Sequence, residues 1–548
     1  MVKTRLLSSL EKVLCDQAAE EKPLDLQALK GETISFQLAF CADEPGWQEV
    51  TVQAEGPIAA NIRLRQVVDV PVRMANYPDG DDDLLHGGKP GLYPDLLREI
   101  KPHALKLSPQ WNSLWVDVLP EGLAPGKYPV TLTLAGADGN CLARRTTYVE
   151  VLDAALPPQK LLLTRWFHCD GLARIYRTEP FSERHWQVIE NQLRVAVRRG
   201  MNMLLTPIHT PPLDTAVGHE RMTTQLVDIT VEKGEYRFSM DKLRRWIRMA
   251  LDCGIPHFEA AHLYTQWGAR HAPKIMATVD GEYRRIFGWE TDAVCEEYRA
   301  FLAAYIPAVR AVFREEGVED RVRWHISDEP SAAHLESYLA ARRQVDDLLD
   351  GCIIMDALSN FEYYQQGIVA HPVVATNHVQ PFLRAGAPDL WVYYCCAQYK
   401  RVSNMFIAMP ASRNRVLGFQ LFRHNAAGFL HWGYNFYNSQ YSIRHLNPFA
   451  ETDAGEAFPS GDAFLVYPGE DGKPLESIRL MVLDEALRDL RALEQLEERK
   501  GRAHVEALID ELAGERITFA QYPRRADFLY ELRRRVNAEI SGIAKQAQ

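Results

Sequence analysis

The sequence between residues 161 and 209 decides the fold: LLLTRWFHC (161–169), then ERHWQVIENQLRVAVRR (183–199), then MLLTPIH (203–209). The first and third segments are short apolar runs, as expected of buried strands. The middle segment places apolar residues at helical spacing, and Gly200 follows it where a left-handed residue ends a helix. The three segments therefore predict one strand–helix–strand unit with parallel strands.

The same pattern continues from this unit toward the C-terminus. Eight strands are expected, at 161–169, 203–209, 257–264, 322–328, 352–359, 373–378, 390–396 and 428–435, and the clearer helices at 183–199, 240–253, 293–316 and 332–349. Gly254, Gly317 and Gly351 follow the last three helices, as Gly200 follows the first. Eight strands predict a (β/α)8 barrel of the TIM type over 157–474. Because the later helices are weak, an open doubly wound sheet is the alternative, although no G-x-G-x-x-G supports a dinucleotide site.

The regions on either side of the predicted barrel differ from it in composition. Residues 1–156 alternate apolar and polar residues in short runs, at 34–40, 62–72, 114–119, 128–134 and 144–151, which predicts an antiparallel β-sandwich. The run LPPQ (156–159) is incompatible with a strand and indicates a domain boundary. Residues 475–548 predict a helical extension, whose mixed charges are typical of a solvent-exposed face.

Composition limits which partners and which cellular compartment are expected for this protein. The formal net charge is −11, and no long basic run offers a surface for nucleic acid. No apolar run of membrane-spanning length occurs, so no membrane span is expected. Nine cysteines without a C-x-x-C pair, and no apolar signal segment near the N-terminus, indicate free thiols and a cytoplasmic location. The oligomeric state is not indicated.

Two adjacent carboxylates stand at the end of the fourth expected strand, in WHISDEP (324–330). Functional groups of such barrels lie at the carboxyl ends of the strands, so Asp328 and Glu329 are the candidate catalytic residues. Neighbours on a strand point to opposite faces, so both can face one site only if the strand breaks there. Pro330 is expected to end the strand while it keeps Glu329 extended. The charge of Asp328 is expected to raise the pKa of Glu329, which then serves as a general acid.

The spacing of these two carboxylates also bears on the mechanism. A retaining glycosidase with two protein carboxylates needs them about 5 Å apart on opposite faces of the sugar, and adjacent residues cannot straddle a ring. A 2-acetamido oxygen of the substrate is then the candidate nucleophile, with Asp328 orienting the acetamide N–H. This predicts hydrolysis of a β-linked N-acetylhexosaminide. A distant protein nucleophile, Asp170 or Asp356, is the alternative.

Other strand ends carry aromatic, amide and imidazole groups, which suit a sugar. The candidate substrate-binding residues are Trp166, His168, Asp170, His209, Asn377, Tyr393, Tyr394, Trp432 and Asn435. The pattern H-x-E-x-x-H at 257–262 lacks the zinc-protease order and is interpreted as structural, so no metal is expected. No organic cofactor is indicated, and G-x-S-x-G is absent.

These residues resemble glycoside hydrolase family 123, the β-N-acetylgalactosaminidases and their relatives. The resembling segments are RWFHCD (165–170), LTPIHTPPLD (205–214), SDEP (327–330), GFLHWGYN (428–435) and GDAFLVYPG (461–469). The resemblance implies an exo-acting, retaining, substrate-assisted hydrolase, with Asp328 polarising the acetamide and Glu329 as acid/base. It also implies β-linked N-acetylgalactosamine, as in glycosphingolipid-derived oligosaccharides. A β-N-acetylglucosaminidase and a non-catalytic carbohydrate-binding barrel remain the alternatives.

Overall fold

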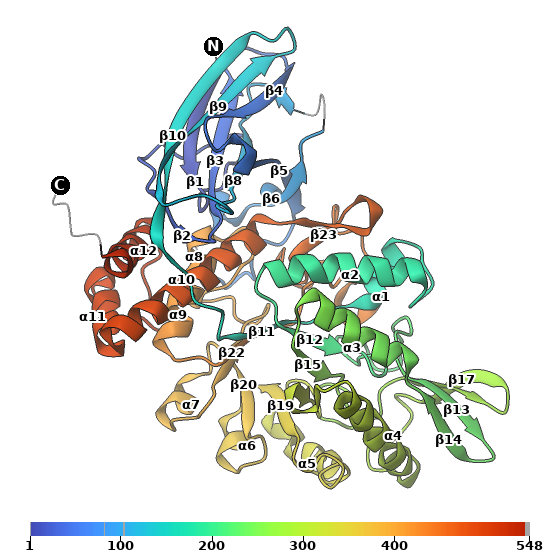
Figure 1. The fold of residues 1–548 in the computed structure, drawn as a ribbon. Helices are drawn as coiled ribbons and strands as arrows, with labels where there is room; N and C mark the ends of the chain where they lie inside the picture. The colour runs from blue at the N-terminus through green and yellow to red at the C-terminus, as the bar shows by residue number, and fades with distance from the viewer. Residues whose placement is uncertain (1, 82, 102–104, 543–548) are drawn as a thin grey trace.

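The computed structural model describes residues 2–81, 83–101 and 105–542. Along the chain, two β-sheets are followed by a closed barrel and then by three helices. Figure 1 shows the two sheets at one end of the molecule, the barrel at the other, and the last helices beside both.

The N-terminal region is built from two five-stranded sheets. Their orders are β1-β3-β8-β5-β6 and β2-β10-β9-β4-β7. The strands are β1 (Val2–Ser8), β2 (Leu26–Lys30), β3 (Ile34–Ala42), β4 (Gln48–Glu55), β5 (Ile62–Val72), β6 (Gly91–Glu99), β7 (Leu105–Leu107), β8 (Asn112–Val118), β9 (Gly126–Gly136) and β10 (Cys141–Ala155). Neighbours are antiparallel except β10 and β2, which are parallel. Side chains of both sheets, such as Phe36 and Val130, share one apolar core, which confirms the predicted antiparallel β-region.

The next strands form a closed barrel of eight parallel strands. They are β11 (Leu162–Arg165), β12 (Met203–Thr206), β15 (His257–Ala260), β18 (Val322–Trp324), β19 (Ile353–Leu358), β20 (His371–Ala375), β21 (Trp391–Tyr393) and β22 (Gly428–His431). Each overlaps one of the eight expected ranges. The barrel closes where β11 pairs with β22, Leu162 opposite Gly428. The open-sheet alternative is therefore wrong, and the arrangement fits a TIM-like barrel.

Helices connect the barrel strands. They are α1 (Cys169–Ile175), α2 (Glu183–Arg198), α3 (Asp241–Cys253), α4 (Glu296–Glu315), α5 (Leu335–Arg343), α6 (Phe361–Gln365), α7 (Gln380–Arg384), α8 (Ala411–Arg415) and α9 (Leu417–Arg423). The predicted helices α2, α3 and α4 are confirmed, whereas α5 is shorter than its expected range. Gly200, Gly254, Gly317 and Gly351 all have left-handed φ, from 70° to 98°, as their positions after helices predict.

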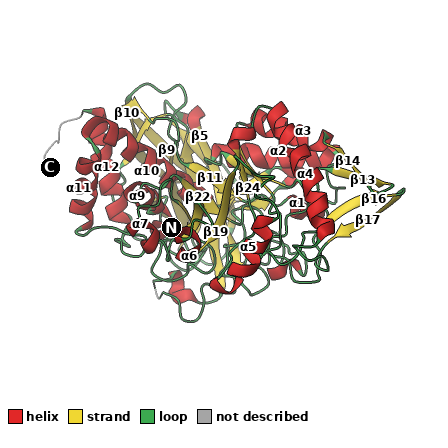
Figure 2. Ribbon diagram, turned by 90° about the horizontal axis from the view of Figure 1, so that it is seen from below, coloured by secondary structure: helices red, strands yellow, loops and turns green. Residues whose placement is uncertain are grey.

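Two small sheets were not predicted. The larger combines β13 (Asp228–Glu232), β14 (Glu235–Ser239), β16 (Ile275–Val279) and β17 (Glu282–Phe287), and Figure 2 shows it projecting at one end of the molecule. The smaller pairs β23 (Val466–Pro468) with β24 (Pro474–Glu476). The larger consists of two hairpins inserted between barrel elements, and the smaller follows the last barrel strand. The alternation of polar and apolar residues in DITVE (228–232) and EYRFS (235–239) is the signal that would have predicted the first hairpin.

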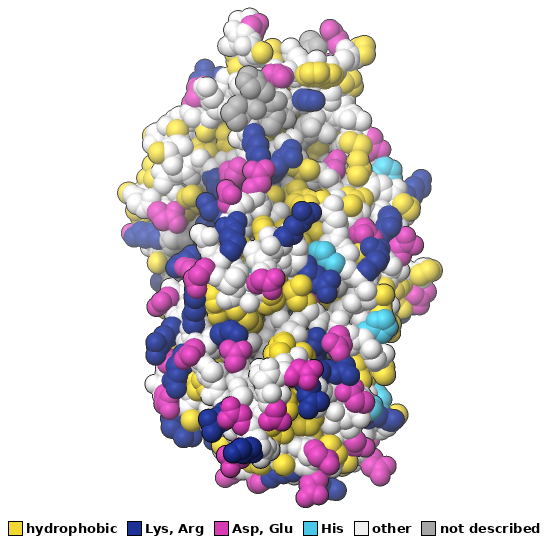
Figure 3. Space-filling model, turned by 90° about the vertical axis from the view of Figure 1, so that its right-hand side faces the viewer, with side chains coloured by type: hydrophobic (Ala, Val, Ile, Leu, Met, Phe, Trp, Pro, Cys, Tyr) yellow, Lys and Arg dark blue, Asp and Glu magenta, His cyan; other side chains and the backbone are white. Residues whose placement is uncertain are grey.

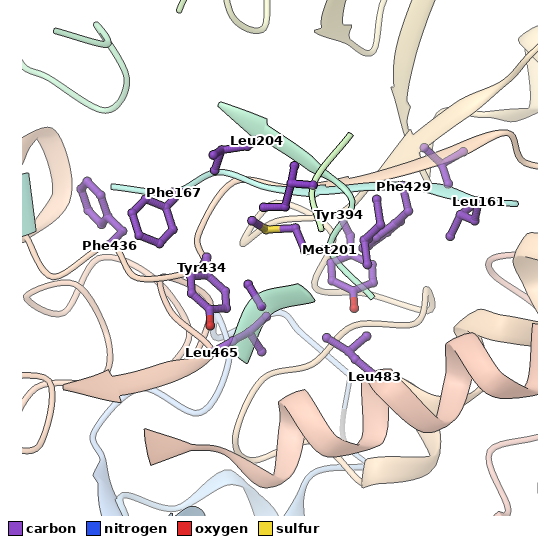
Figure 4. Close-up of a cluster of buried hydrophobic side chains, with 14 of the residues drawn as sticks. Leu161, Phe167, Met201, Leu204, Tyr394, Phe429, Tyr434, Phe436, Leu465 and Leu483 are labelled. Atoms are coloured by element: carbon purple, nitrogen blue, oxygen red, sulfur yellow. The ribbon is translucent and has the colours of Figure 1, made fainter. Parts of the chain in front are cut away.

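The C-terminal region consists of α10 (Ile478–Lys500), α11 (Arg502–Ala513) and α12 (Ala526–Ser541). The expectation that its charges mark a solvent-exposed face is wrong for α10, which is buried along most of its length. Its charges are paired instead: Asp489 accepts from Arg415 at 2.8 Å and from Arg533 at 2.9 Å. Leu483 of the same helix joins an apolar cluster outside the barrel wall with Tyr394 and Phe429 (Figure 4).

The surface and the thiols agree with the composition. Figure 3 shows acidic and basic side chains interspersed over one face of the molecule, without a large block of either sign. All nine cysteines are free thiols, as expected. In the described part of the chain, no helix combines the length and the apolar character that crossing a bilayer requires.

Candidate active site

Asp328 and Glu329 lie in a break of the chain beyond β18. The strand ends at Trp324, and both carboxylate residues are half-buried. Glu329 has φ 45°, in the left-handed region, so it is not extended as Pro330 was expected to keep it. The left-handed residue removes the alternation of a strand. The charge of Glu329 raises the pKa of Asp328, whereas burial and Asp462 raise that of Glu329, so the expectation that Asp328 would raise the pKa of Glu329 is wrong in its direction. Such strain in a non-glycine residue is typical of functional sites.

Residues of two other barrel strands, β19 and β21, hold Glu329. Its N–H donates to the carbonyl of Ala357 at 3.0 Å, and the Tyr393 hydroxyl donates to its Oε1 at 2.5 Å. Tyr393 is the last residue of β21 and faces the barrel interior. Burial raises the pKa of Glu329, and the Tyr393 hydrogen bond opposes that rise. Tyr393, predicted from the sequence as a substrate-binding residue, thus contacts one of the candidate acids directly.

Asp328 carries a buried oxygen without a protein partner. Its backbone carbonyl accepts from the Trp267 N–H at 2.9 Å, but Oδ1 has no hydrogen-bond partner among the described residues. Burial first, and the Glu329 charge second, raise the pKa of Asp328 well above its usual range. Two such carboxyls cannot both ionise easily, so the pair retains a proton and leaves an acceptor open.

A buried, charged cluster lies beneath this pair. His325 Nε2 is 3.0 Å from Glu259 Oε2, and its Nδ1 is 3.5 Å from Asp356 Oδ1. Burial lowers the pKa of His325, but the nearby carboxylates of Asp356 and Glu259 outweigh that and raise it to about 9. A protonated His325 favours the ionised form of Asp328.

The same cluster positions the Trp166 indole. Trp166 Nε1 donates to Glu259 at 3.1 Å, and its ring packs edge-on against His325 and His262. Sequence reasoning missed the roles of Glu259 and His325, although both stood in segments that it singled out. Glu259 is the central acid of the H-x-E-x-x-H pattern, and its structural interpretation agrees with these contacts.

His262, His325 and Asp356 are the one group that offers three ligand atoms for a metal among the described residues, all within 4.8 Å of one another. The two imidazoles, however, stack with their centroids 4.4 Å apart and their planes only 20° apart. Imidazole lone pairs lie in the ring plane, so two nearly parallel stacked rings do not converge on one ion. The stacked geometry therefore does not favour a metal centre, although neither ring nitrogen of His262 has a hydrogen-bond partner among the described residues.

Trp432 joins Trp166 and Tyr393 at the barrel interior, so these three predicted binding residues lie together. Its indole N–H donates to Asp462 Oδ2 at 2.8 Å. Asp462 is fully buried, and its charge raises the pKa of Glu329 in addition to burial. Asp462 was not singled out individually, although it lies in one of the family-like segments.

Three other predicted residues form a buried layer behind Trp432. Asp170 accepts from Arg221 Nε at 3.0 Å, and the guanidinium outweighs burial to hold the pKa of Asp170 at about 2. The His168 ring lies 3.1 Å from the same guanidinium through Nδ1. The backbone N–H of His168 donates to Asn435 Oδ1 at 2.8 Å. Both oxygens of the Asp170 carboxylate are thus engaged in a buried ion pair with Arg221.

The remaining predicted residues are not brought together with the carboxylates. Tyr394 comes directly after the end of β21 and points the other way from Tyr393, into the apolar cluster of Figure 4. His209 is buried, with Nε2 2.8 Å from the His262 carbonyl. Asn377 is exposed and accepts from Gln398 at 3.0 Å.

The N-terminal region also reaches this end of the barrel, which the sequence did not predict. Tyr77 lies in the loop between β5 and β6, and its ring is 4.9 Å from that of Tyr399. Its hydroxyl donates to the Ala457 carbonyl at 3.1 Å. Burial and then the neighbouring Cys396 raise the pKa of Tyr77. No sequence signal connects this loop with the strand ends.

A closed parallel barrel with adjacent acids at its mouth is an arrangement found among glycoside hydrolases. The chain belongs to glycoside hydrolase family 123, because residues 166–496, more than half of it, match the description "Glycoside hydrolase 123, catalytic domain". The result confirms the family resemblance noted from the sequence and makes the chain a glycosidase by family.

A solved structure of the same family has the same fold. A family 123 glycoside hydrolase from Clostridium perfringens, studied for glycolipid glycan hydrolysis, aligns with 99% of this chain and 98% of its own, with TM-score 0.75 and 16% identity. A xylanase of family 10 from Thermobacillus composti covers 60% of this chain and 97% of its own, at 10% identity and TM-score 0.30, which is too low to bear on the fold. No curated protein sequence matches.

Proposed function

We propose that this protein is an exo-acting, retaining β-N-acetylgalactosaminidase that uses the substrate's acetamido group as nucleophile. The observation that carries the proposal is the placement of Asp328 and Glu329 as adjacent, half-buried carboxylates at one break of the chain. In this proposal the two acids have separate tasks: Asp328 acts on the acetamide and Glu329 on the leaving oxygen.

The alternative protein nucleophiles are poorly placed. Asp170 is 2% exposed and bound by Arg221. Asp356 is fully buried, accepts from the Ile326 N–H at 2.9 Å, and also accepts from the Tyr338 hydroxyl. Neither carboxylate is free to attack a sugar carbon, which supports an internal nucleophile.

The first step follows from the partners of the two acids. In the substrate complex the proton of the pair is on Glu329 and Asp328 is ionised, a state that His325 favours against burial and the charge of Glu329. Asp328 then accepts the acetamide N–H and so raises the nucleophilicity of the acetamide oxygen. That oxygen forms a bond to C1 as the C1–aglycone bond breaks, and the leaving oxygen takes the proton of Glu329. Tyr393 donates to Oε1, which leaves Oε2 as the oxygen that carries this proton.

The second step reverses the proton transfer. Glu329, now ionised, removes a proton from water as the water oxygen attacks C1 and the bond from the acetamide oxygen to C1 breaks. Two displacements at C1 retain the β configuration. Trp166, Tyr393 and Trp432 are proposed to surround the sugar, because they share the barrel interior beside the acids. The galacto preference rests on family membership.

The test is hydrolysis of paired 4-nitrophenyl β-GalNAc and β-GlcNAc glycosides by wild type, Asp328→Asn, Glu329→Gln and a control, Glu235→Gln. Glu235 is exposed in the distant β13–β14 hairpin. We expect faster GalNAc cleavage, first release of the β-anomer by NMR, inhibition by a GalNAc-thiazoline, and loss in both site variants but not in the control. Preferential GlcNAc cleavage overturns the sugar assignment, and insensitivity to the thiazoline overturns the internal nucleophile.

A further inference from the structure

Two large aromatic rings stand exposed near the candidate acids. Trp267 is 39% exposed and Tyr441 is 38% exposed, in a protein that buries most of its aromatic side chains. Their centroids are 5.7 Å apart and their planes meet at 87°, so together they form an open right-angled corner. Trp267 lies in the loop after β15, and Tyr441 in the loop after β22. The corner is therefore assembled from loops at the carboxyl ends of two barrel strands.

Hydrogen bonds fix this corner relative to Asp328. The Trp267 N–H donates to the Asp328 carbonyl at 2.9 Å. The Tyr441 N–H donates to Asp214 Oδ2 at 3.0 Å, and the Asp214 N–H donates to Gln266 Oε1 at 2.5 Å. Asp214 thus connects the loop of Tyr441 with the residue before Trp267. The two rings are held at a set position beside the acid pair.

The residues that carry the two exposed rings have strained backbone conformations. Trp267 has φ 56°, Tyr441 has φ 59° and Ser442 has φ 56°, all left-handed. A bulky residue disfavours this conformation, and burial of these rings does not compensate for it. Strain of this kind is retained where it presents a side chain for function.

A polar group beside the corner is also unpaired. Gln266 is 5% exposed, and among the described residues its Nε2 has no hydrogen-bond partner. A buried amide N–H without a partner is costly, and a ligand oxygen would satisfy it. An aromatic face beside a free N–H donor suits a sugar, whose C–H face stacks on a ring while its hydroxyls accept hydrogen bonds.

We infer that Trp267 and Tyr441 form the subsite for the sugar on the leaving-group side of the scissile bond. The inference rests on the proposed function and deepens it, because it names the side chains that recognise the leaving-group sugar: its C–H face stacks on this corner. In the proposed function the terminal sugar lies beside the half-buried acids Asp328 and Glu329. The rest of an exo-substrate extends toward solvent and there meets the exposed rings of Trp267 and Tyr441. Gln266 contributes a hydrogen bond to one hydroxyl.

The experiment compares two substrates that share the terminal sugar. One is a disaccharide with β-linked N-acetylgalactosamine on galactose, and the other is methyl β-N-acetylgalactosaminide. We expect Trp267→Ala and Tyr441→Ala each to lower kcat/KM on the disaccharide on the order of tenfold, mainly through KM. The methyl glycoside, which has no second ring, is expected to change less than about twofold.

Two exposed aromatics distant from the site provide matched controls. Trp47 and Tyr283 are each 63% exposed, and their alanine variants are expected to leave both substrates unaffected. Equal losses on both substrates in the Trp267 and Tyr441 variants, or no loss on the disaccharide, overturn the subsite.

A binding measurement separates this inference from the proposed function. Calorimetric titration of Glu329→Gln is expected to show tighter binding of the disaccharide than of the methyl glycoside, and the added Trp267→Ala change is expected to remove the difference. If wild type cleaves neither substrate, the proposed function fails, and this titration alone decides the subsite. If the disaccharide gains no affinity over the methyl glycoside, the subsite is overturned while the hydrolase proposal stands.

Discussion

Replacing Tyr393 by phenylalanine removes a single oxygen that donates to Glu329 at 2.5 Å. Hydrogen bonds to charged groups contribute about 1.5–3 kcal/mol. About 1.4 kcal/mol corresponds to one pKa unit, so loss of the donor is expected to change the pKa of Glu329 by about one to two. The pKa of Glu329 is expected to rise, because the hydrogen bond that is removed lowers it.

The assay is the pH dependence of kcat/KM on an aryl glycoside. Its high-pH limb reports loss of the proton from the general acid of the free enzyme. In Tyr393→Phe we expect that limb to move to higher pH by about one unit or more, since the acid keeps its proton longer. Because the two acids titrate as a pair, the shift belongs to the Asp328–Glu329 pair.

The adjacent tyrosine is the control. Tyr394→Phe removes a hydroxyl without a hydrogen-bond partner among the described residues, on the opposite side of the strand. We expect its pH profile to match wild type. A limb that stays in place in Tyr393→Phe, or one that moves to lower pH, refutes the assignment of the proton to Glu329.

Three further predictions concern stability. Glu329→Gly is expected to be inactive yet more stable than Glu329→Ala by about 1 kcal/mol, because glycine accepts the left-handed φ; equal melting temperatures would contradict the strain at this residue. His325 has its pKa raised to about 9 in the folded state, so its contribution to stability is complete below about pH 6.5 and is lost as pH rises through 9. Melting temperatures of wild type are therefore expected to fall across this range more than those of His325→Gln, and parallel curves would exclude a charged His325. Arg221→Met leaves Asp170 buried without its partner and is expected to cost about 3–5 kcal/mol, whereas Lys22→Met breaks an exposed pair and is expected to cost under about 1 kcal/mol; similar melting shifts would refute the difference.

The sequence was sufficient to predict the barrel because its signals are local. Apolar runs, amphipathic helices and a glycine after each clear helix recur along the chain, and each reports its own segment. Closure of the sheet is not local. It depends on β11 meeting β22 across more than 260 residues of sequence, so the open sheet stayed an alternative until the pairing of Leu162 with Gly428 was observed.

The sequence places residues at the end of a strand but does not determine which of two consecutive side chains faces the barrel interior. Tyr393 and Tyr394 are consecutive, and a one-residue change of register exchanges which faces the barrel interior. Both were therefore candidates, although only Tyr393 contacts Glu329. Asp170 illustrates another limit, since its partner Arg221 lies in a loop without any periodic signal.

The charges of α10 were misjudged for a similar reason. Mixed charges at helical spacing predict exposure when the helix is considered alone. Their partners, Arg415 and Arg533, lie on other helices, so the sequence of α10 does not show that they are neutralised in the interior.

The ion pairs between the first sheets and the segment that ends the barrel have a consequence for how this gene can recombine. Arg65 of β5 reaches Glu476, and Asp95 of β6 accepts from Arg479 at 2.9 Å, with all four side chains almost entirely buried. The family match begins at residue 166, yet a gene fragment cut there would encode Glu476 and Arg479 without their counter-charges. Uncompensated buried charges are strongly destabilising, so a crossover near residue 157 that brings in an unrelated first domain is expected to yield an insoluble product. Exchange of the family-matched segment between genes therefore requires that the two N-terminal sheets travel with it.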